Sequence, residues 1–447
     1  MEKKKILFMP LGIGIAHVGR TLMLARELRR RGHEIFFAAG KAVSPLIEKE
    51  GIINFTLPEI PPKENIKRIR RLKPNFYTKA VIKKFLNAEL KLYKKIKPDL
   101  VIADTRVTAK ISTKIAKIPL ITINNTNATK YYDFTRARFP IPIFFLNEFI
   151  HSTLLYPLEK EWMQKKVLSR VGPPIVEAFL VRQLMTFNLV MQQYDLGPIK
   201  SLYSLLKGDL TLLADVPFFR PTKKLPSDVK LVGPLSWQPP MELPEWKADL
   251  ENLSESKKPI VYITAAGTGD GKIVRKTIES LSEFPATIVV TTGNAMSLKS
   301  LRNISKEDIY ITDYLPGDWI MQKARAVVFF GGNSTVYQAL INGVPQIILP
   351  LHLDQQDNAN QLERLGTGIA INPNRFDEKA LIEKLSLVIY HKGFKKKSEK
   401  YKNLLKKWNG PVTAANEVEK FLRTKKIKSK ESFIEKVFRL KSILKTF

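Results

Sequence analysis

The 447-residue chain contains no cysteine and only 5 histidines. The absence of cysteine excludes disulfide bonds, thiolate catalysis and cysteine-ligated metal sites, and it fits a cytosolic protein. Acidic residues are also scarce, with 42 Asp and Glu against 74 Lys and Arg, which gives a formal net charge of +32. A charge of this size favours an anionic partner, which is a nucleic acid, an anionic membrane surface or a phosphorylated ligand.

Long hydrophobic runs are missing as well. Pro10, Gly12 and Gly14 interrupt the apolar stretch near the N-terminus, so a strand that enters a glycine loop is a better interpretation than a signal peptide. The stretch 139–150 contains two prolines, an Asn and a Glu, and it is too short and too polar to span a bilayer. With 44% hydrophobic and 26% charged residues, the chain is expected to form two domains of roughly 200 residues each.

Short buried strands alternate with helical stretches in two successive series. Residues 6–9 and 34–39 predict strands, and the residues between them predict a helix that ends near Gly32. The first series continues at 100–103 and 120–123, and a second opens at 259–263. Such alternation indicates parallel sheets that bind ligands at the carboxyl ends of their strands. We therefore predict an α/β fold of two doubly wound, Rossmann-like domains that face a cleft.

Two regions concentrate the positive charge. Residues 63–97 hold thirteen Lys and Arg against two acids, and their latter part places apolar residues on one helical face. Residues 424–447 space their apolar side chains by four and three positions among many lysines. Both patterns are typical of basic amphipathic helices, which either bind a membrane surface or pack on their own domain with the basic face in solvent. The sequence leaves both interpretations open.

The strongest local motif follows the predicted strand 326–330. It consists of Gly331, Gly332, Asn333, Ser334 and Thr335, and a helical run comes next. The glycines let a ligand approach the backbone closely, and the amides at the helix N-terminus form an anion site. Further residues at regular spacing strengthen the pattern: Gln338-Ala339, Gly343-Val344-Pro345, Asp354-Gln355 and Asn358-Ala359.

With this continuation, residues 330–368 resemble the donor-binding segment of nucleotide-sugar glycosyltransferases of the two-Rossmann (GT-B) architecture. The resemblance is to the UDP-glycosyltransferase and macrolide-glycosyltransferase type, which is related to the lipid-acceptor transferases of the same fold. It extends to residues 228–235 and to Ala266-Gly267-Thr268, and so covers most of the chain. Residues 60–97 and 130–200 match no motif of the family.

The resemblance implies a role for each donor-side residue. The glycine-rich amides at 331–335 bind the diphosphate, and Gly267 and Thr268 belong to the same donor site. Gln338 stands where the family has a Glu that accepts from both ribose hydroxyls, and an amide has only one accepting atom. Asp354 and Gln355 correspond to the pair that holds sugar hydroxyls. Two departures concern the nucleotide: Phe330 replaces a phosphate-binding His, and Gly317 replaces a base-stacking Gln.

The acceptor side centres on His17, which begins a helix after the glycine loop and resembles the His of the family's Gly-His-x-x-Pro motif. The resemblance implies that this His takes the proton from an acceptor hydroxyl, and a pKa near working pH suits that task. Asp104 matches the Asp that orients the His. A His at a helix start is otherwise more often a cap or a surface residue. Arg20 is a candidate ligand of an acceptor phosphate, with an ordinary helix-surface Arg as the alternative.

The other histidines lack partners in the sequence, and no metal-ligand spacing occurs. We therefore expect no metal and no cofactor, with the nucleotide diphosphate sugar as co-substrate. The resemblance assigns 1–237 to an acceptor-binding domain with insertions at about 60–97 and 130–200, and 257–390 to a nucleotide-sugar-binding domain. The remaining segments are a proline-rich linker at 238–256, helices at 391–423 that return to the first domain, and a basic amphipathic tail at 424–447.

The predicted function is direct, inverting transfer of a sugar, from a UDP-sugar first of all, to a hydroxyl or phosphate of an acceptor. The apolar segment 139–145 and the basic insertions favour a membrane lipid as acceptor, and an enzyme bound peripherally to the cytoplasmic face of an anionic membrane. A nucleotide-sugar epimerase of the same fold and a transferase with a soluble acceptor are the alternatives. No nucleic-acid-binding motif is present, so we expect no nucleic-acid partner.

Overall fold

The structure is a computed structural model. It describes residues 2–12, 15–61, 64, 77–140, 158, 160–238, 242–248, 258–267, 269–293, 295–304, 306–373 and 376–424. Several predictions concern residues outside these ranges: Thr268, most of the proline-rich linker, most of the apolar segment at 139–145, and the basic tail after Thr424.

The first half of the chain forms a seven-stranded sheet in the order β3-β2-β1-β4-β5-β6-β7, and all of its pairs are parallel. The strands are β1 Lys5–Pro10, β2 Glu34–Ala39, β3 Asn54–Thr56, β4 Leu100–Asp104, β5 Leu120–Asn124, β6 Leu210–Leu213 and β7 Val229–Leu231. The four strands predicted in this half are therefore confirmed. The others were not predicted, and two of them, β3 and β7, have only three residues.

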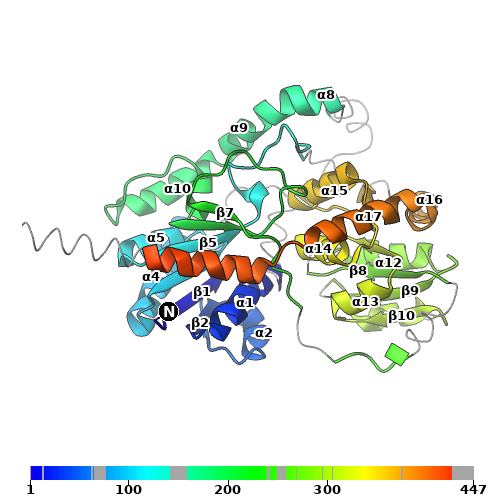
Figure 1. The fold of residues 1–447 in the computed structure, drawn as a ribbon, viewed down its shortest axis with the longest axis horizontal. Helices are drawn as coiled ribbons and strands as arrows, with labels where there is room; N and C mark the ends of the chain where they lie inside the picture. The colour runs from blue at the N-terminus through cyan, green and yellow to red at the C-terminus, as the bar shows by residue number, and fades with distance from the viewer. Residues whose placement is uncertain are drawn as a thin grey trace, which may run out of the picture.

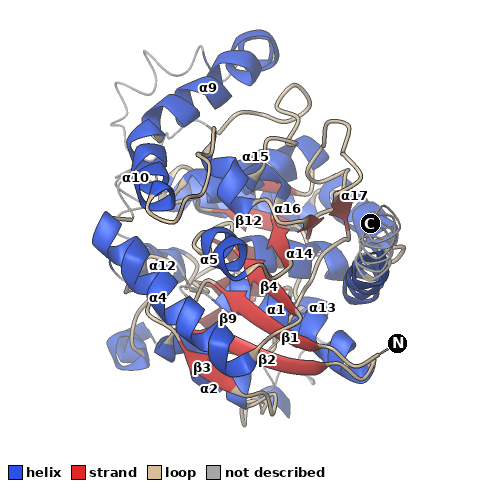
Figure 2. Cartoon of the chain, turned by 90° about the vertical axis from the view of Figure 1, so that its left-hand side faces the viewer, coloured by secondary structure: helices blue, strands red, loops and turns tan. Residues whose placement is uncertain are grey.

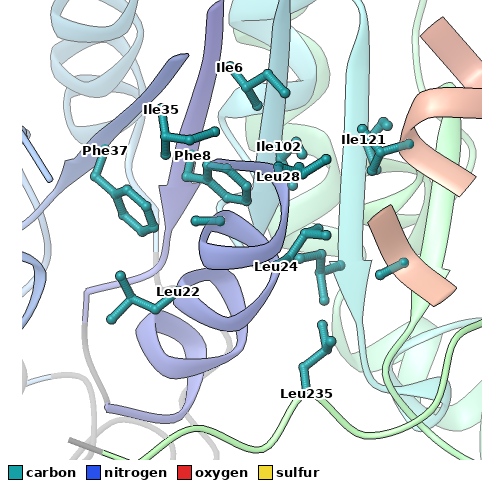
Figure 3. Close-up of a cluster of buried hydrophobic side chains, with 14 of the residues drawn as sticks. Ile6, Phe8, Leu22, Leu24, Leu28, Ile35, Phe37, Ile102, Ile121 and Leu235 are labelled. Carbon is teal, nitrogen blue, oxygen red and sulfur yellow. The ribbon is translucent and has the colours of Figure 1, made fainter. Parts of the chain in front are cut away.

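Helix α1 (Ile15–Arg30) covers one face of this sheet. Its apolar positions Leu22 and Leu28 pack with Phe8 of β1 and Phe37 of β2 in one buried cluster (Figure 3). The helix ends at Arg30, and the turn after it contains Gly32, whose φ of +92° suits a residue without Cβ. The remaining helices of this half are α2 Ser44–Glu48, α4 Lys79–Ile96, α5 Ala109–Ala116, α8 Glu161–Met163, α9 Ser169–Phe179 and α10 Val181–Gln192.

The second half repeats the architecture with a six-stranded parallel sheet in the order β10-β9-β8-β11-β12-β13. Its strands are β8 Ile260–Thr264, β9 Thr287–Thr291, β10 Ile309–Thr312, β11 Ala326–Phe329, β12 Gln346–Ile348 and β13 Gly368–Ala370. Its helices are α12 Gly271–Ser280, α13 Gly317–Lys323, α14 Asn333–Asn342, α15 Leu353–Leu365, α16 Glu378–Tyr390 and α17 Lys392–Leu405. The two halves lie next to each other in Figure 1, which confirms the predicted α/β fold of two Rossmann-like domains.

The predicted helix in the basic region 63–97 is α4, and it packs on its own domain. Ile82 and Leu86 of α4 lie in one buried cluster with Phe187 of α10. Glu89 is buried on the same side of the helix and accepts a 2.7 Å hydrogen bond from Arg106 Nε. The described part of this basic region thus matches the interpretation of an amphipathic helix with a solvated basic face.

After α17 the chain returns to the first domain as a helix over residues 410–424 (Figure 1). Ala414, Ala415 and Val418 belong to the buried cluster of β1 and α1. Glu419 accepts a 3.0 Å hydrogen bond from Arg31, just after α1. The end of the described chain therefore ties the two domains together.

Candidate functional site

The proposed base is held at the carboxyl edge of the first sheet. His17 lies in the first turn of α1, directly after the loop that follows β1, and Asp104 is the last residue of the neighbouring strand β4. His17 Nδ1 and Asp104 Oδ1 are 2.7 Å apart. The Asp104 side chain is fully buried, whereas that of His17 is 28% exposed. The structure therefore brings together the two residues that the sequence resemblance pairs, with the imidazole open to an incoming group.

Arg20, one turn after His17, takes part in the same cluster. Its Nη2 donates to Asp104 Oδ1 at 2.8 Å, and its Nη1 donates to Asn125 Oδ1, just after β5. Burial by itself raises the pKa of Asp104, but the charges of Arg20 and His17 outweigh it and hold that pKa below its usual value. The interpretation of Arg20 as a helix-surface residue is wrong, because its side chain is buried. Its guanidinium orients Asp104 instead of facing solvent.

The donor motif forms the loop between β11 and α14. Gly331 has a φ of +84°, and Gly332 is the residue before the helix. The first helical hydrogen bond in α14 joins Val336 N–H to Gly332 O at 3.0 Å. The amides of residues 333–335 precede that bond, so they point from the helix N-terminus, where an anionic group is stabilised. This geometry suits the diphosphate of a donor.

The loop after β8 lies beside the donor loop, because β8 and β11 are paired and Thr264 is opposite Phe329. Gly267 is exposed at this edge. A Cβ on Gly269 would lie 2.8 Å from the Phe330 ring, so the two loops touch. Phe330, which stands where the resemblance expects a phosphate-binding His, is part of the buried hydrophobic core of the second domain.

Gly317 and Gln338, the other two residues that differ from the family pattern, are in contact. A Cβ on Gly317 would lie 2.6 Å from Gln338 Oε1. The Gln338 carboxamide therefore occupies space beside the backbone of α13 that a larger residue at 317 would fill. The two positions to which the resemblance assigns ribose contact and base stacking are thus in direct contact with each other.

Asp354 and Gln355, the two residues that the resemblance assigns to the sugar hydroxyls, differ in their exposure to solvent. Asp354 is 44% exposed and accepts a 2.8 Å hydrogen bond from Asn127 Nδ2. Gln355 is buried, and its Oε1 accepts from Leu351 N–H at 2.7 Å. Asp354 is therefore placed to contact a sugar, while Gln355 shapes the turn before α15.

Sequence reasoning missed a buried ion cluster that joins the domains. Arg220, which lies between β6 and β7, donates to Asp357 Oδ2 and, at 2.6 Å, to Asn358 Oδ1. Its side chain is fully buried, and Asp215 lies 3.4 Å from it. Asp357 is three residues after Asp354 on α15, and this helical spacing was the only available sign of a shared site. Nothing in the sequence around Arg220 indicated its partners.

Glu59 is a second residue that the sequence did not single out. Its Oε1 accepts from Gly12 N–H at 2.8 Å and from Gly40 N–H at 3.1 Å, which ties the loops after β1 and β2 together. Burial raises the pKa of Glu59, although Arg106 and the two amides act in the opposite direction. This carboxylate holds the loop that leads into His17.

The two halves of the site meet across the domain boundary. Asn125 Oδ1, which accepts from Arg20, also lies 3.4 Å from Asn333 Nδ2 at the start of α14. The cluster around His17 and the N-terminus of α14 are thus linked through the side chains of Arg20 and Asn125. Within the described residues there is no group of three or more His, Asp or Glu side chains that could hold a metal ion.

Two family models match the chain. Residues 275–420 match "Erythromycin biosynthesis protein CIII-like, C-terminal domain", and residues 4–141 match "Glycosyl transferase family 1". A "PGL/p-HBAD biosynthesis rhamnosyltransferase" of Mycobacterium bovis (strain BCG / Pasteur 1173P2) is 29% identical over 378 residues, which is 84% of this chain and 78% of that protein.

Solved structures of glycosyltransferases share the fold. The calicheamicin glycosyltransferase CalG4 superposes with a TM-score of 0.67 at 18% identity, over 95% of this chain and 99% of that one. The glycosyltransferase VinC in complex with dTDP gives a TM-score of 0.64 at 16% identity, over 94% and 98%.

The fold and the site thus define a glycosyltransferase of the two-Rossmann GT-B class that uses a nucleotide-sugar donor. Within that class, the two matching family models, one in each domain, support the UDP-glycosyltransferase type.

Proposed function

We propose that this enzyme transfers a sugar from a nucleoside diphosphate sugar to a hydroxyl of a membrane lipid by direct, inverting displacement. The observation that carries the proposal is the 2.7 Å contact between His17 Nδ1 and Asp104 Oδ1. With Nδ1–H donating to this buried carboxylate, Nε2 carries the lone pair and is available as a base.

In the proposed step, His17 Nε2 takes the proton of the acceptor hydroxyl while that oxygen forms a bond to the anomeric carbon. The bond from this carbon to the diphosphate oxygen breaks, and the nucleoside diphosphate leaves with the electron pair. Asp104 stabilises the imidazolium that forms. The amides at the N-terminus of α14 stabilise the negative charge on the leaving diphosphate. Attack opposite the leaving group inverts the anomeric centre.

Two classes of donor are supported. The resemblance favours a UDP-sugar. The dTDP complex of VinC and the name of the mycobacterial rhamnosyltransferase favour dTDP-rhamnose as a second candidate donor. A lipid acceptor is supported by the net charge of +32 and by the exposed apolar face described below. Both the charge and the lack of cysteine agree with our proposal of an enzyme on the cytoplasmic face of the membrane.

The test is a thermal-shift screen of UDP- and dTDP-sugars, followed by transfer assays with the best donor and with lipid and water-soluble alcohols. NMR of the product should show an inverted anomeric centre. His17→Ala should lower the turnover number by about 10²–10⁴-fold, whereas His391→Ala, at the start of α17 and remote from the site, should not. Full transfer by His17→Ala would show that the base is wrongly assigned. Conversion of the donor sugar without an acceptor would favour an epimerase.

A further inference from the structure

Large exposed apolar side chains are concentrated in residues 167–189, which belong mostly to the helices α9 and α10. Figures 1 and 2 show where these two helices lie in the molecule. A group of neighbouring exposed apolar side chains often marks a site of interaction with a protein or a membrane. The most exposed are Ile175, at 63%, and Met185, at 59%. The whole set, called the apolar face below, comprises Val167, Val171, Ile175, Val181, Met185 and Leu189.

These side chains lie on one side of a bent helical rod. They recur every four residues before and after Leu180, whose φ of −94° and ψ of 0° keep the chain close to helical there. At 3.6 residues per turn, residues four apart within α9 or within α10 lie on the same side of their helix. Val167 lies in the short helical segment Gln164–Leu168 that precedes α9. The opposite side is the buried one, because Phe187 and Val190 of α10 pack against Ile82 of α4. The apolar face therefore points away from the core.

Charge around the face is positive. Lys166, Arg170 and Arg182 are exposed beside it. The only acid in residues 169–192 is Glu177, and its Oε1 accepts a hydrogen bond of 3.2 Å from Ser201 Oγ. An apolar stripe edged by cations is typical of helices that lie in the interface of an anionic membrane. A protein partner would have to bring both an apolar surface and excess acid.

Among the described residues, no single helix is both long enough and apolar enough to span a membrane. The pair Gln164–Ala178 and Val181–Gln192, bent by 49°, reaches the required length and composition only when taken together. The side of α10 that carries Phe187 and Val190 forms part of the protein core, so the other side of α10 is the one free to meet lipid.

We propose that the apolar face rests on the surface of an anionic lipid bilayer and delivers the acceptor lipid to the site. This proposal builds on the lipid acceptor of the proposed function. Trp162 of α8, exposed at the start of the rod, lies in the headgroup region, where Trp side chains are favoured. The membrane surface is thus assigned to α9 and α10, whereas the packed helix α4 contributes only its basic outer side.

A chain of aromatic rings connects this face to the donor site. Gly172 lets α9 approach Phe139 closely, since a Cβ there would lie 2.5 Å from the ring. The ring centroids of Phe139 and Phe134 are 5.3 Å apart, and those of Phe134 and Tyr132 are 4.6 Å apart. Tyr132 then donates a 2.6 Å hydrogen bond to Asp357, on the same helix as Asp354. This series of contacts joins α9 to the buried Tyr132 and to α15, so the apolar face is coupled through packed side chains to the helix that carries Asp354.

The test is flotation of the full-length protein with vesicles of phosphatidylglycerol and phosphatidylcholine, and with vesicles of phosphatidylcholine alone. The double variant Ile175→Glu/Met185→Glu should bind the anionic vesicles at least about tenfold more weakly than wild type. The control Ile53→Glu/Leu387→Glu makes the same change at exposed apolar residues elsewhere, and it should bind like wild type. Anionic vesicles should also shift the Trp emission to the blue in wild type but much less in Trp162→Phe.

Unchanged flotation of the Ile175/Met185 variant would overturn the proposal. So would a wild-type dimer that this variant converts to monomers without altering flotation, because the face would then join two copies of the chain. Transfer to a water-soluble alcohol separates the two proposals. The variant should keep this activity while losing transfer to vesicle lipid. Wild-type protein that floats but transfers to no lipid would refute the lipid acceptor while leaving the docking surface in place.

Discussion

Asn127 of the first domain donates a 2.8 Å hydrogen bond to Asp354 of the second, from a position 227 residues earlier in the chain. The same Nδ2 lies 3.0 Å from Asp357 Oδ2. The carboxylate proposed to hold the donor sugar is therefore oriented by the opposite domain. Donor binding should depend on a residue that no donor motif contains.

Asn127→Ala should raise the KM for the donor by about tenfold, because an oriented hydrogen bond to a charged group contributes roughly 1.5–3 kcal/mol. The turnover number should fall less, since the base is untouched. Steady-state kinetics with varied donor concentration measure both. Asn188→Ala is the matched control, because Asn188 also makes two side-chain hydrogen bonds, with Ile199, far from the site. Equal KM values for both variants would contradict the assignment.

Asp104→Asn should lower the turnover number by about 10²–10⁴-fold while leaving the donor KM nearly unchanged. The amide removes the charge that stabilises the imidazolium of His17. Asp99→Asn, at an exposed carboxylate beside β1, is the control and should keep full activity. A turnover number within twofold of wild type for Asp104→Asn would refute the positioning role.

Asp104 should also make the free energy of unfolding depend on pH in the acidic range. Its pKa is lowered in the folded state, so it contributes stability above its unfolded pKa of about 3.9, and this is lost as the pH falls through the lower folded pKa. Urea unfolding between about pH 6 and pH 2 measures the effect. Asp104→Asn should be less stable than wild type at neutral pH, and the difference should shrink on acidification. A constant difference would argue against the lowered pKa.

Gly332→Ala and Gly331→Ala should separate donor binding from folding. Nothing lies within 4 Å of a Cβ on Gly332, so its variant should keep the wild-type Tm while the added methyl raises the donor KM. A Cβ on Gly331 would lie 2.9 Å from Ile348 Cγ2, at a φ of +84°. That backbone conformation alone costs about 1–2 kcal/mol for an L-residue, so Gly331→Ala should lower the Tm. A donor KM equal to that of wild type in Gly332→Ala would refute the assignment of diphosphate binding to this loop.

Glu59→Gln should retain the loop bonds while removing a buried charge. The pKa of Glu59 is raised in the folded state, so its ionisation makes unfolding easier as the pH rises from its unfolded pKa, about 4.3, through the folded pKa. Glu59→Gln should lack this decline in stability, and chemical unfolding at several pH values would show it. Glu59→Ala, which leaves the amides of Gly12 and Gly40 without their acceptor, should lose both stability and activity. Equal behaviour of the two variants would contradict this role.

Much of the architecture was predictable because it is local. Alternating strands and helices, the Gly32 helix end and the glycines at 331–332 depend on residues close together in the chain. The short edge strand β3 was not predictable, since three residues carry too little periodicity. Its position comes from pairing with β2.

The sequence by itself determined the two-domain fold, the glycine-rich loop proposed to bind the donor, and the identity of the proposed base His17 and its partner Asp104. Only the tertiary structure decided that Arg20 turns inward to Asp104, that Arg220 joins the domains through Asp357, and that α9 and α10 expose an apolar face. The physical reason is the separation along the chain of the residues that interact. Helix periodicity and glycine conformation are local, whereas ion pairing and exposure depend on which distant segments meet.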